Sequence, residues 1–158
     1  MGMRIGIGYD VHRLVPGRPL KLGGVTIPFE RGLLGHSDAD AVLHALCDAL
    51  LGAAGQPDIG ELFPDNDPRW KDADSRRFVQ EALQRVSNAG YSVANVDLII
   101  HAQQPRLGAY KEQIRAAVAQ LVGVARDAVG VKATTNEGLD AIGRGEAIAC
   151  WAAVLLQG

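Results

Sequence analysis

Three side chains near the start of the chain have the chemistry of a metal site: Asp10, His12 and His44. Asp10 and His12 lie two positions apart in a stretch that reads as a strand, so both project from one face, beside Gly6 and Gly8. The glycines would leave room for something to approach the backbone there. With His44, from the helix that follows, the set has three ligands and one open position. Such a set is typical of a catalytic rather than a structural zinc ion, although each residue alone also has an ordinary structural reading.

Two aspartates flank the third candidate ligand along its helix. Asp40 and Asp48 lie one turn on either side of His44, so either could orient the free ring nitrogen of that histidine. A solvated helix surface, or a charge paired with the helix dipole, is an equally good reading of both.

Two further segments have the chemistry to bind phosphate. Residues 36–38 (HSD) stand where a helix begins, and free backbone N–H groups there can bind an anion. Helix capping by Ser37 or Asp38 is the simpler reading. Residues 132–137 (KATTNE) follow a strand and offer two hydroxyls, an ammonium and a carboxylate around a polyphosphate. Glu137 would suit a hard divalent cation there, and the alternative is an edge strand followed by a loop.

Common motifs of covalent catalysis and of nucleotide binding are missing from the sequence. It contains no GxSxG, no GxxxxGK[ST], no GxGxxG before a helix and no plausible catalytic cysteine. The turn 143–146 (GRGE) could bind an anion through Arg144, although spacing alone favours a surface Arg–Glu turn. In place of covalent catalysis, an acidic site that can bind a metal suits a nucleophile that is already anionic and attacks phosphorus.

The elements that must position these residues alternate between strands and helices. Apolar alternation and helical periodicity predict strands at 4–12, 93–101, 129–135 and 147–156, and helices from about 38 to 52, at 75–88 and at 107–122. Residues 20–28 read as a short strand or a hairpin arm, interrupted by Gly23 and Gly24. Residues 58–70 form a long loop of the kind that is often functional. The order favours an α/β fold, a two-layer sandwich of a mixed β-sheet with helices packed on one face.

Composition places the chain among globular proteins with a single domain, 1–158. A net charge of -2 argues against nucleic-acid binding, and the apolar runs are too short to span a bilayer. The N-terminus lacks the apolar region of a signal peptide. Cys47 and Cys150 read as buried free thiols, which suits a cytoplasmic location.

Taken together, six segments resemble the 2-C-methyl-D-erythritol 2,4-cyclodiphosphate synthases, in order and over essentially the whole chain. They are GYDVHRL (8–14), GLLGHSDAD (32–40), HALCDALLGA (44–53), DIGELFPD (58–65), KATTNE (132–137) and GRGE (143–146). The resemblance implies a phosphorus–oxygen lyase of the non-mevalonate isoprenoid pathway. It would convert 4-diphosphocytidyl-2-C-methyl-D-erythritol 2-phosphate into the cyclic diphosphate and CMP, as a homotrimer with active sites between subunits.

The same resemblance implies cofactors and site residues. Asp10, His12 and His44 would hold Zn²⁺ or another divalent transition metal, and Glu137 would hold Mg²⁺ or Mn²⁺. His36 and Thr135 would stabilise the transition state. The other implied substrate-binding residues are Ser37, Asp58, Ile59, Gly60, Phe63, Pro64, Asp65, Asn66, Asp67, Ala102, Gln103, Gln104, Pro105, Arg106, Leu107, Gly108, Thr134, Asn136, Ala141 and Arg144. Residues 102–108, with Thr134 and Thr135, would form a cytidine pocket contributed by a neighbouring subunit.

Three departures from the family pattern stand in these segments. Arg106 replaces a usual lysine and keeps its charge, and Gln104 replaces a usual small residue. Asp140 and Ala141 stand where the family usually has Gly-Phe. In some members that phenylalanine helps to hold an isoprenoid diphosphate on the trimer axis, so its loss puts such binding in question, while Arg144 could still hold a small anion.

Two other functions use the same residues. A zinc phosphohydrolase would use the three ligands to activate water and would release inorganic phosphate. A non-catalytic protein that binds metal or isoprenoid would show no turnover. Both alternatives leave the phosphate-type and cytidine-type segments unexplained.

Overall fold

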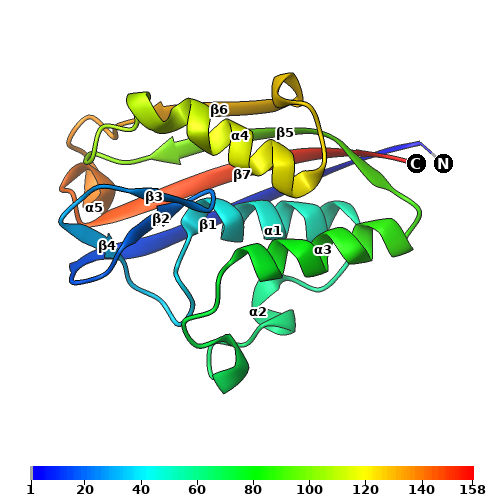
Figure 1. The fold of residues 1–158 in the computed structure, drawn as a ribbon, viewed down its shortest axis with the longest axis horizontal. Coiled ribbons are helices and arrows are strands. Elements are labelled where there is room, and N and C mark those ends of the chain that lie inside the picture. The colour runs from blue at the N-terminus through cyan, green and yellow to red at the C-terminus, as the bar shows by residue number, and fades with distance from the viewer. Residues whose placement is uncertain (1) are drawn as a thin grey trace.

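A five-stranded mixed sheet forms one layer of the protein, and the long helices cover one of its faces (Figure 1). The computed structural model describes residues 2–158. The strand order is β4 (Arg31–Leu33), β1 (Met3–Pro16), β7 (Ala147–Gln157), β5 (Ser92–His101) and β6 (Val129–Thr134). The β5–β6 pair is parallel, and the other pairs are antiparallel. The predicted two-layer α/β sandwich with a mixed sheet is therefore confirmed.

The helical layer consists of α1 (Ala41–Ala53), α3 (Arg76–Asn88) and α4 (Lys111–Val122). α1 lies across β1 and β7, α3 packs on α1, and α4 lies over β6 (Figure 1). Between them come the β2–β3 hairpin (Leu20–Leu22 and Val25–Ile27), the short helices α2 (Ile59–Leu62) and α5 (Asp140–Gly143), and the 3₁₀ turns η1 (Pro68–Trp70), η2 (Gly108–Tyr110) and η3 (Arg126–Ala128). Most buried apolar side chains lie between the two layers.

Two glycines allow β1 and α1 to approach closely. A Cβ added to Gly6 would lie 1.9 Å from the carbonyl oxygen of Ala49, and one added to Gly8 would lie 1.9 Å from that of Ala45. The space that the sequence predicted beside these glycines is thus filled by the backbone of α1. This close approach brings His44, which precedes Ala45, over the strand that carries Asp10.

The other face of β1 is exposed and apolar. Ile5 is 81 % exposed and Ile7 is 68 % exposed, and Tyr9, Val11 and Trp151 of the neighbouring β7 are also exposed. The strand therefore turns its small and polar residues towards the helices and its large apolar residues away from them.

Several predicted details differ in the structure. The N-cap of α1 is Asp40, and not Ser37 or Asp38, because the Asp40 carboxylate accepts from the backbone N–H of Leu43 at 3.0 Å. The predicted helix 107–122 begins as a 3₁₀ turn and becomes α-helical only at Lys111. The sequence also gave no sign of β4 or α5, which have three and four residues.

Two further expectations can be compared with the structure. Cys47 and Cys150 are both buried and free, as predicted. In residues 2–158, no helix is both long enough and apolar enough to cross a membrane.

Candidate metal centre and its cavity

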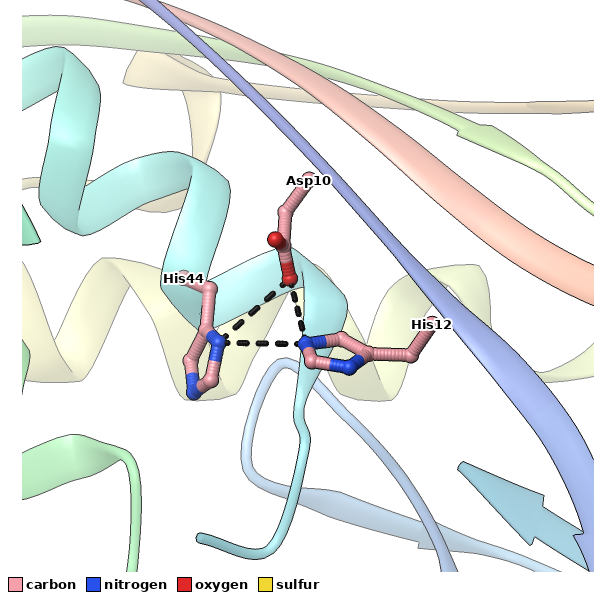
Figure 2. A group of neighbouring side chains, drawn as sticks. All are labelled: Asp10, His12 and His44. Carbon is pink, nitrogen blue, oxygen red and sulfur yellow. Dashed lines mark hydrogen bonds and ion pairs between the residues drawn. The ribbon is translucent and has the colours of Figure 1, made fainter. Parts of the chain in front are cut away.

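Asp10, His12 and His44 converge at the junction of β1 and α1 (Figure 2). The Oδ2 atom of Asp10 lies 2.7 Å from Nε2 of His12 and 3.4 Å from Nδ1 of His44. The two ring nitrogens lie 3.3 Å apart. The three candidate ligands that the sequence indicated therefore form one cluster.

Hydrogen bonding outside the cluster decides which nitrogen of His12 can act as a ligand. Its Nδ1 lies 2.9 Å from the carbonyl oxygen of Leu34, which can only accept, so Nδ1 carries the proton. In the neutral ring, Nε2 then presents a lone pair towards Asp10 and His44. Lone pairs that face one another repel, so this arrangement of His12, Asp10 and His44 is favourable only when a cation lies among the three side chains.

The electrostatics of the metal-free cluster agree with this conclusion. Burial disfavours the charged form of Asp10, yet hydrogen bonds and charges from His12 and His44 outweigh it and lower the pKa of Asp10 below its ordinary value. Burial also disfavours protonated His12, but the Asp10 carboxylate raises the pKa of His12 above its ordinary value. Without a metal, a proton on His12 takes the place of the cation.

The donor set fits a divalent transition metal. A tetrahedral ion with bonds of about 2.0–2.1 Å has ligand atoms roughly 3.3 Å apart. Two of the three separations in the cluster, 3.3 and 3.4 Å, match that value. One carboxylate oxygen and two imidazole nitrogens suit zinc and related metals.

Hydroxyl groups, rather than the two aspartates on its own helix, contact the outer nitrogen of His44. Its Nε2 lies 2.9 Å from Oγ of Ser75 and 3.1 Å from Oγ of Ser37. The prediction that Asp40 or Asp48 orients this nitrogen is wrong. The carboxylate of Asp40 accepts from Gly23, Gly24 and Leu43. That of Asp48 accepts from the N–H of Ile59 at 2.8 Å, which fixes the start of α2.

A cavity of about 640 Å³ opens beside the cluster. It brings together many of the residues that the sequence predicted for the site: Asp10, His12, His36, Ser37, His44, Ile59, Gly60, Phe63, Pro64, Asp65 and Asn66. Gly35, Trp70 and Phe78 also line it and were missed. The rings of Phe63 and Phe78 lie 4.6 Å apart and those of Phe63 and Trp70 5.1 Å apart, so one wall is aromatic. Phe78 reads in the sequence as part of an apolar helix stripe, which gives no sign of this role.

Three predicted residues near this cavity shape its loop. Nε2 of His36 donates to the carbonyl oxygen of Asp67 at 2.8 Å. The Asp67 carboxylate pairs with the exposed Arg69 guanidinium, which lowers the pKa of Asp67. The Asp58 carboxylate accepts from the N–H of Glu61 at 3.0 Å and is the N-cap of α2. Asp58 and Asp67 thus hold the backbone and do not line the cavity itself.

A second cavity, of about 620 Å³, lies where β5 and β6 end. It brings together the predicted residues Ala102, Gln103, Gln104, Pro105, Arg106, Leu107, Gly108, Thr134 and Thr135. Phe29, Ala133 and Lys111 also line it and were missed; a lysine in the first turn of a helix, such as Lys111, carries no distinctive signal. Within residues 2–158, no residue lines both cavities.

The remaining predicted residues line neither cavity. Glu137 is exposed, with φ +55, and its N–H donates to Oγ1 of Thr135 at 3.2 Å. Asn136 accepts from Nδ1 of His101 and donates to the Asp140 carboxylate. Ala141 lies in α5. The Arg144 guanidinium pairs with Glu146 at 3.2 Å, so the surface Arg–Glu turn is present.

The Asp140 position shows how one departure from the family pattern fits the fold. Its φ of +60 is in the left-handed region that favours glycine. Aspartate tolerates this region better than most residues, and here its carboxylate accepts from the N–H groups of Ile142 and Gly143.

The fold and the cluster define a class of protein: a mixed-sheet α/β protein with an Asp-His-His cluster, between its first strand and first long helix, that could hold a metal ion. The model of the YgbB family matches residues 3–157, and the chain belongs to this family. It is 59 % identical over 154 residues to the 2-C-methyl-D-erythritol 2,4-cyclodiphosphate synthase of Moorella thermoacetica, covering 98 % of this chain and 94 % of that one. Identity to the synthase of Burkholderia thailandensis is 58 %, over 99 % and 96 % of the two chains.

The solved structures agree with this assignment. One of a 2-C-methyl-D-erythritol 2,4-cyclodiphosphate synthase in its CDP-bound form superposes with a TM-score of 0.90 at 42 % identity. The match covers 98 % of this chain and 100 % of that one.

Proposed function

We propose that this chain is a metal-dependent cyclodiphosphate synthase, a phosphorus–oxygen lyase of the non-mevalonate isoprenoid pathway. Its substrate is 4-diphosphocytidyl-2-C-methyl-D-erythritol 2-phosphate, and its products are 2-C-methyl-D-erythritol 2,4-cyclodiphosphate and CMP. Residues 1–158 act as one synthase domain in the cytoplasm. The observation that carries the proposal is the Asp10–His12–His44 cluster in the lining of a cavity, in a chain 59 % identical to a synthase.

The proposed cofactors are two divalent cations. Asp10, Nε2 of His12 and Nδ1 of His44 would hold Zn²⁺ or another divalent transition metal, and Glu137 would hold Mg²⁺ or Mn²⁺. Bound there, the cations supply charge neutralisation for crowded phosphate groups.

The protein itself has little covalent chemistry to do. The nucleophile is the substrate's 2-phosphate, whose second pKa is about 6, so no general base is required. An oxygen of that phosphate bonds to the β-phosphorus, the bond from the β-phosphorus to the bridging oxygen breaks, and CMP leaves with that oxygen and its electron pair. Holding both ends of one substrate in register can contribute roughly 7–11 kcal/mol.

Residues of the first cavity would hold the methylerythritol phosphate. The hydroxyl of Ser37 and the ring of His36 line the cavity beside the cluster. Because His36 donates to the Asp67 carbonyl, it also ties the 63–67 loop, which lines the cavity, to the segment before α1. The aromatic wall of Phe63, Trp70 and Phe78 excludes water, which would otherwise compete as nucleophile.

Residues of the second cavity would hold the cytidine end. The backbone of 102–108 supplies donors and acceptors, while Arg106 and Lys111 supply positive charge towards an anion. Arg106 keeps the charge of the usual lysine, so CMP recognition is retained. Thr135 belongs to this cavity and lies next to Asn136 and Glu137, which suits transition-state stabilisation near the metal-bound phosphates. The CDP-bound form of a related synthase supports a cytidine diphosphate ligand.

Assembly as a homotrimer would join the two cavities. Since they share no residue within 2–158 of one chain, a substrate that occupies both requires a neighbouring subunit. The exposed apolar face of Ile5, Ile7 and Tyr9 provides a surface for that contact. On the proposed axis, Ala141 offers no ring for contact with an isoprenoid diphosphate, which puts such binding in question, while the exposed Arg144, paired with Glu146, could still hold a small anion.

Phosphorus NMR of turnover tests the proposed reaction. Purified protein with the cytidyl substrate, Zn²⁺ and Mg²⁺ should yield two mutually coupled diphosphate resonances together with CMP. His44→Ala, if its circular dichroism matches wild type, should yield neither. Release of inorganic phosphate would instead establish a phosphohydrolase, and absence of turnover would leave a binding protein.

A further inference from the structure

We propose that Asp38 and Ser75 are positioning residues that fix the tautomer and orientation of His44, so that its Nδ1 atom is available to a cation. The inference rests on the cluster holding a cation, as proposed above, and is independent of the cyclisation reaction.

A carboxylate, a hydroxyl and an imidazole form a chain behind the cluster. The Asp38 carboxylate accepts from the hydroxyl of Ser75 through Oδ1 and from the backbone N–H of Ser75 through Oδ2, the latter at 3.1 Å. The same hydroxyl oxygen lies 2.9 Å from Nε2 of His44. Ser75 is fully buried, and its hydroxyl oxygen also lies 3.5 Å from Oγ of Ser37, at the limit of a hydrogen bond and farther away than His44.

The direction of each hydrogen bond follows from the donor inventory. An ionised carboxylate can only accept, so the single hydroxyl proton of Ser75 points to Asp38. The Ser75 oxygen then presents a lone pair to His44, and Nε2 of His44 must carry the proton. A neutral imidazole has one N–H, so Nδ1 is left with a lone pair that points towards Asp10 and His12 (Figure 2).

Ser37 also contacts His44, but unlike Ser75 it lines the cavity. Its hydroxyl lies 3.1 Å from Nε2 of His44, and it lines the cavity, where it can turn towards a ligand. Ser75 does not line the cavity and keeps its bond to Asp38. The hydrogen bond between Asp38 and Ser75 can therefore stay in place when a ligand enters the cavity.

The backbone holds this pair rigidly. The N–H of Asp38 donates to the carbonyl of Ala73 at 3.0 Å, and the N–H of Asp72 donates to that of His36 at 2.8 Å. These two bonds tie the segment before α1 to the segment before α3. The ring of Phe78, in α3, packs edge-on against His44 with centroids 5.7 Å apart. The entry to α3 thus sets both the proton position and the plane of His44.

Nitrogen-15 NMR of metal-free wild-type protein at a pH where His44 is neutral tests the tautomer directly. The expected result is a proton on Nε2 and a lone pair on Nδ1 of His44. A proton on Nδ1 would overturn the inference, and this readout requires neither a variant nor turnover.

Metal affinity tests the consequence. Titration of metal-free Ser75→Ala with Co²⁺, followed by its visible absorption, should give a Kd about 10–100-fold above wild type, the usual effect of losing such a partner. Asp40→Asn is the matched control, because it removes a buried carboxylate one turn from His44 that bonds only to Gly23, Gly24 and Leu43 among the described residues. An unchanged Kd in Ser75→Ala, or an equal loss in Asp40→Asn, would overturn the proposal.

Discussion

At the scale of single residues, the cluster directs two imidazole nitrogens and a carboxylate oxygen towards one another, a set of donors suited to a cation. His12 and His44 each commit one ring nitrogen to a partner outside the cluster, the Leu34 carbonyl and the serine hydroxyls. Their other nitrogens and the Asp10 carboxylate are left facing one another. A proton or a metal ion satisfies this arrangement, and the two compete for it.

This competition predicts a pH dependence for the metal-free protein. Because Asp10 raises the pKa of His12, protonated His12 adds stability that is fully present below its unfolded pKa and is lost as pH rises through its folded pKa. In EDTA, the stability advantage of wild type over His12→Gln should fall as the pH rises above the ordinary histidine pKa of about 6.5, with a slope of at most about 1.4 kcal/mol per pH unit. Urea unfolding at several pH values measures it. An advantage that grows with pH would contradict the assigned role of His12.

The sequence predicted the three ligands but not their supports. Asp10 and His12 follow from strand alternation, and His44 follows as the next imidazole on a helix. Ser75 is 31 residues from His44, and its contact depends on how α3 enters the fold. Asp40 and Asp48 were the local candidates for this role, and both instead hold backbone N–H groups.

At the scale of elements, the site depends on how closely α1 lies on β1. Gly6 and Gly8 have no side chain to separate the two backbones, and the carbonyl of Ala45 lies in the space that a side chain at Gly8 would take. His44 is adjacent to Ala45 in this contact, and Asp10 is two residues from Gly8, on the same face of β1. The distance between strand and helix therefore sets the size of the metal site.

Gly8→Ala should accordingly be strongly destabilising. The added methyl would lie 1.9 Å from the Ala45 carbonyl oxygen, so α1 must move. We expect a loss of about 3 kcal/mol or more in the free energy of unfolding, together with weaker metal binding. Gly52→Ala, an exposed helix position with nothing within 4 Å of the new methyl, should instead stabilise by about 0.5–1 kcal/mol. Equal effects of the two substitutions in thermal unfolding would show that close approach is unimportant.

Long elements were predictable and short ones were not. β1, β5, β7 and α3 carry enough residues for periodicity to appear. β4, with three residues, and α5, with four, are held by partners distant in sequence, such as β1 for β4. The same holds for the α1 cap, since Asp40 is selected by its bonds to Gly23 and Gly24 of the β2–β3 turn.

At the scale of the whole molecule, the chain leaves an apolar sheet face uncovered. Helices cover one face of the sheet (Figure 1), while Ile5 and Ile7 of β1 are exposed. Alternation in the sequence indicates that one face of β1 is apolar. It does not tell whether that face meets the chain's own helices or another subunit. At the level of sequence, only the family resemblance therefore indicates a trimer.

Ile7→Glu should disrupt the proposed trimer. A carboxylate at a position that is 68 % exposed in the single chain costs little there, but several kcal/mol when buried against another subunit. Sedimentation equilibrium should give the mass of a monomer, and cyclisation should be lost. Gln80→Glu, which adds the same charge on the exposed side of α3, should remain trimeric and active. A monomeric wild type, or an active monomeric variant, would refute the inter-subunit site.

The most direct test of the account is crystallographic anomalous scattering at the zinc absorption edge from protein loaded with Zn²⁺. We predict a peak bonded to Asp10, Nε2 of His12 and Nδ1 of His44 at about 2.0–2.2 Å, with a fourth position facing the cavity. Zinc bound elsewhere with this cluster vacant, or coordinated through Nε2 of His44, would contradict it.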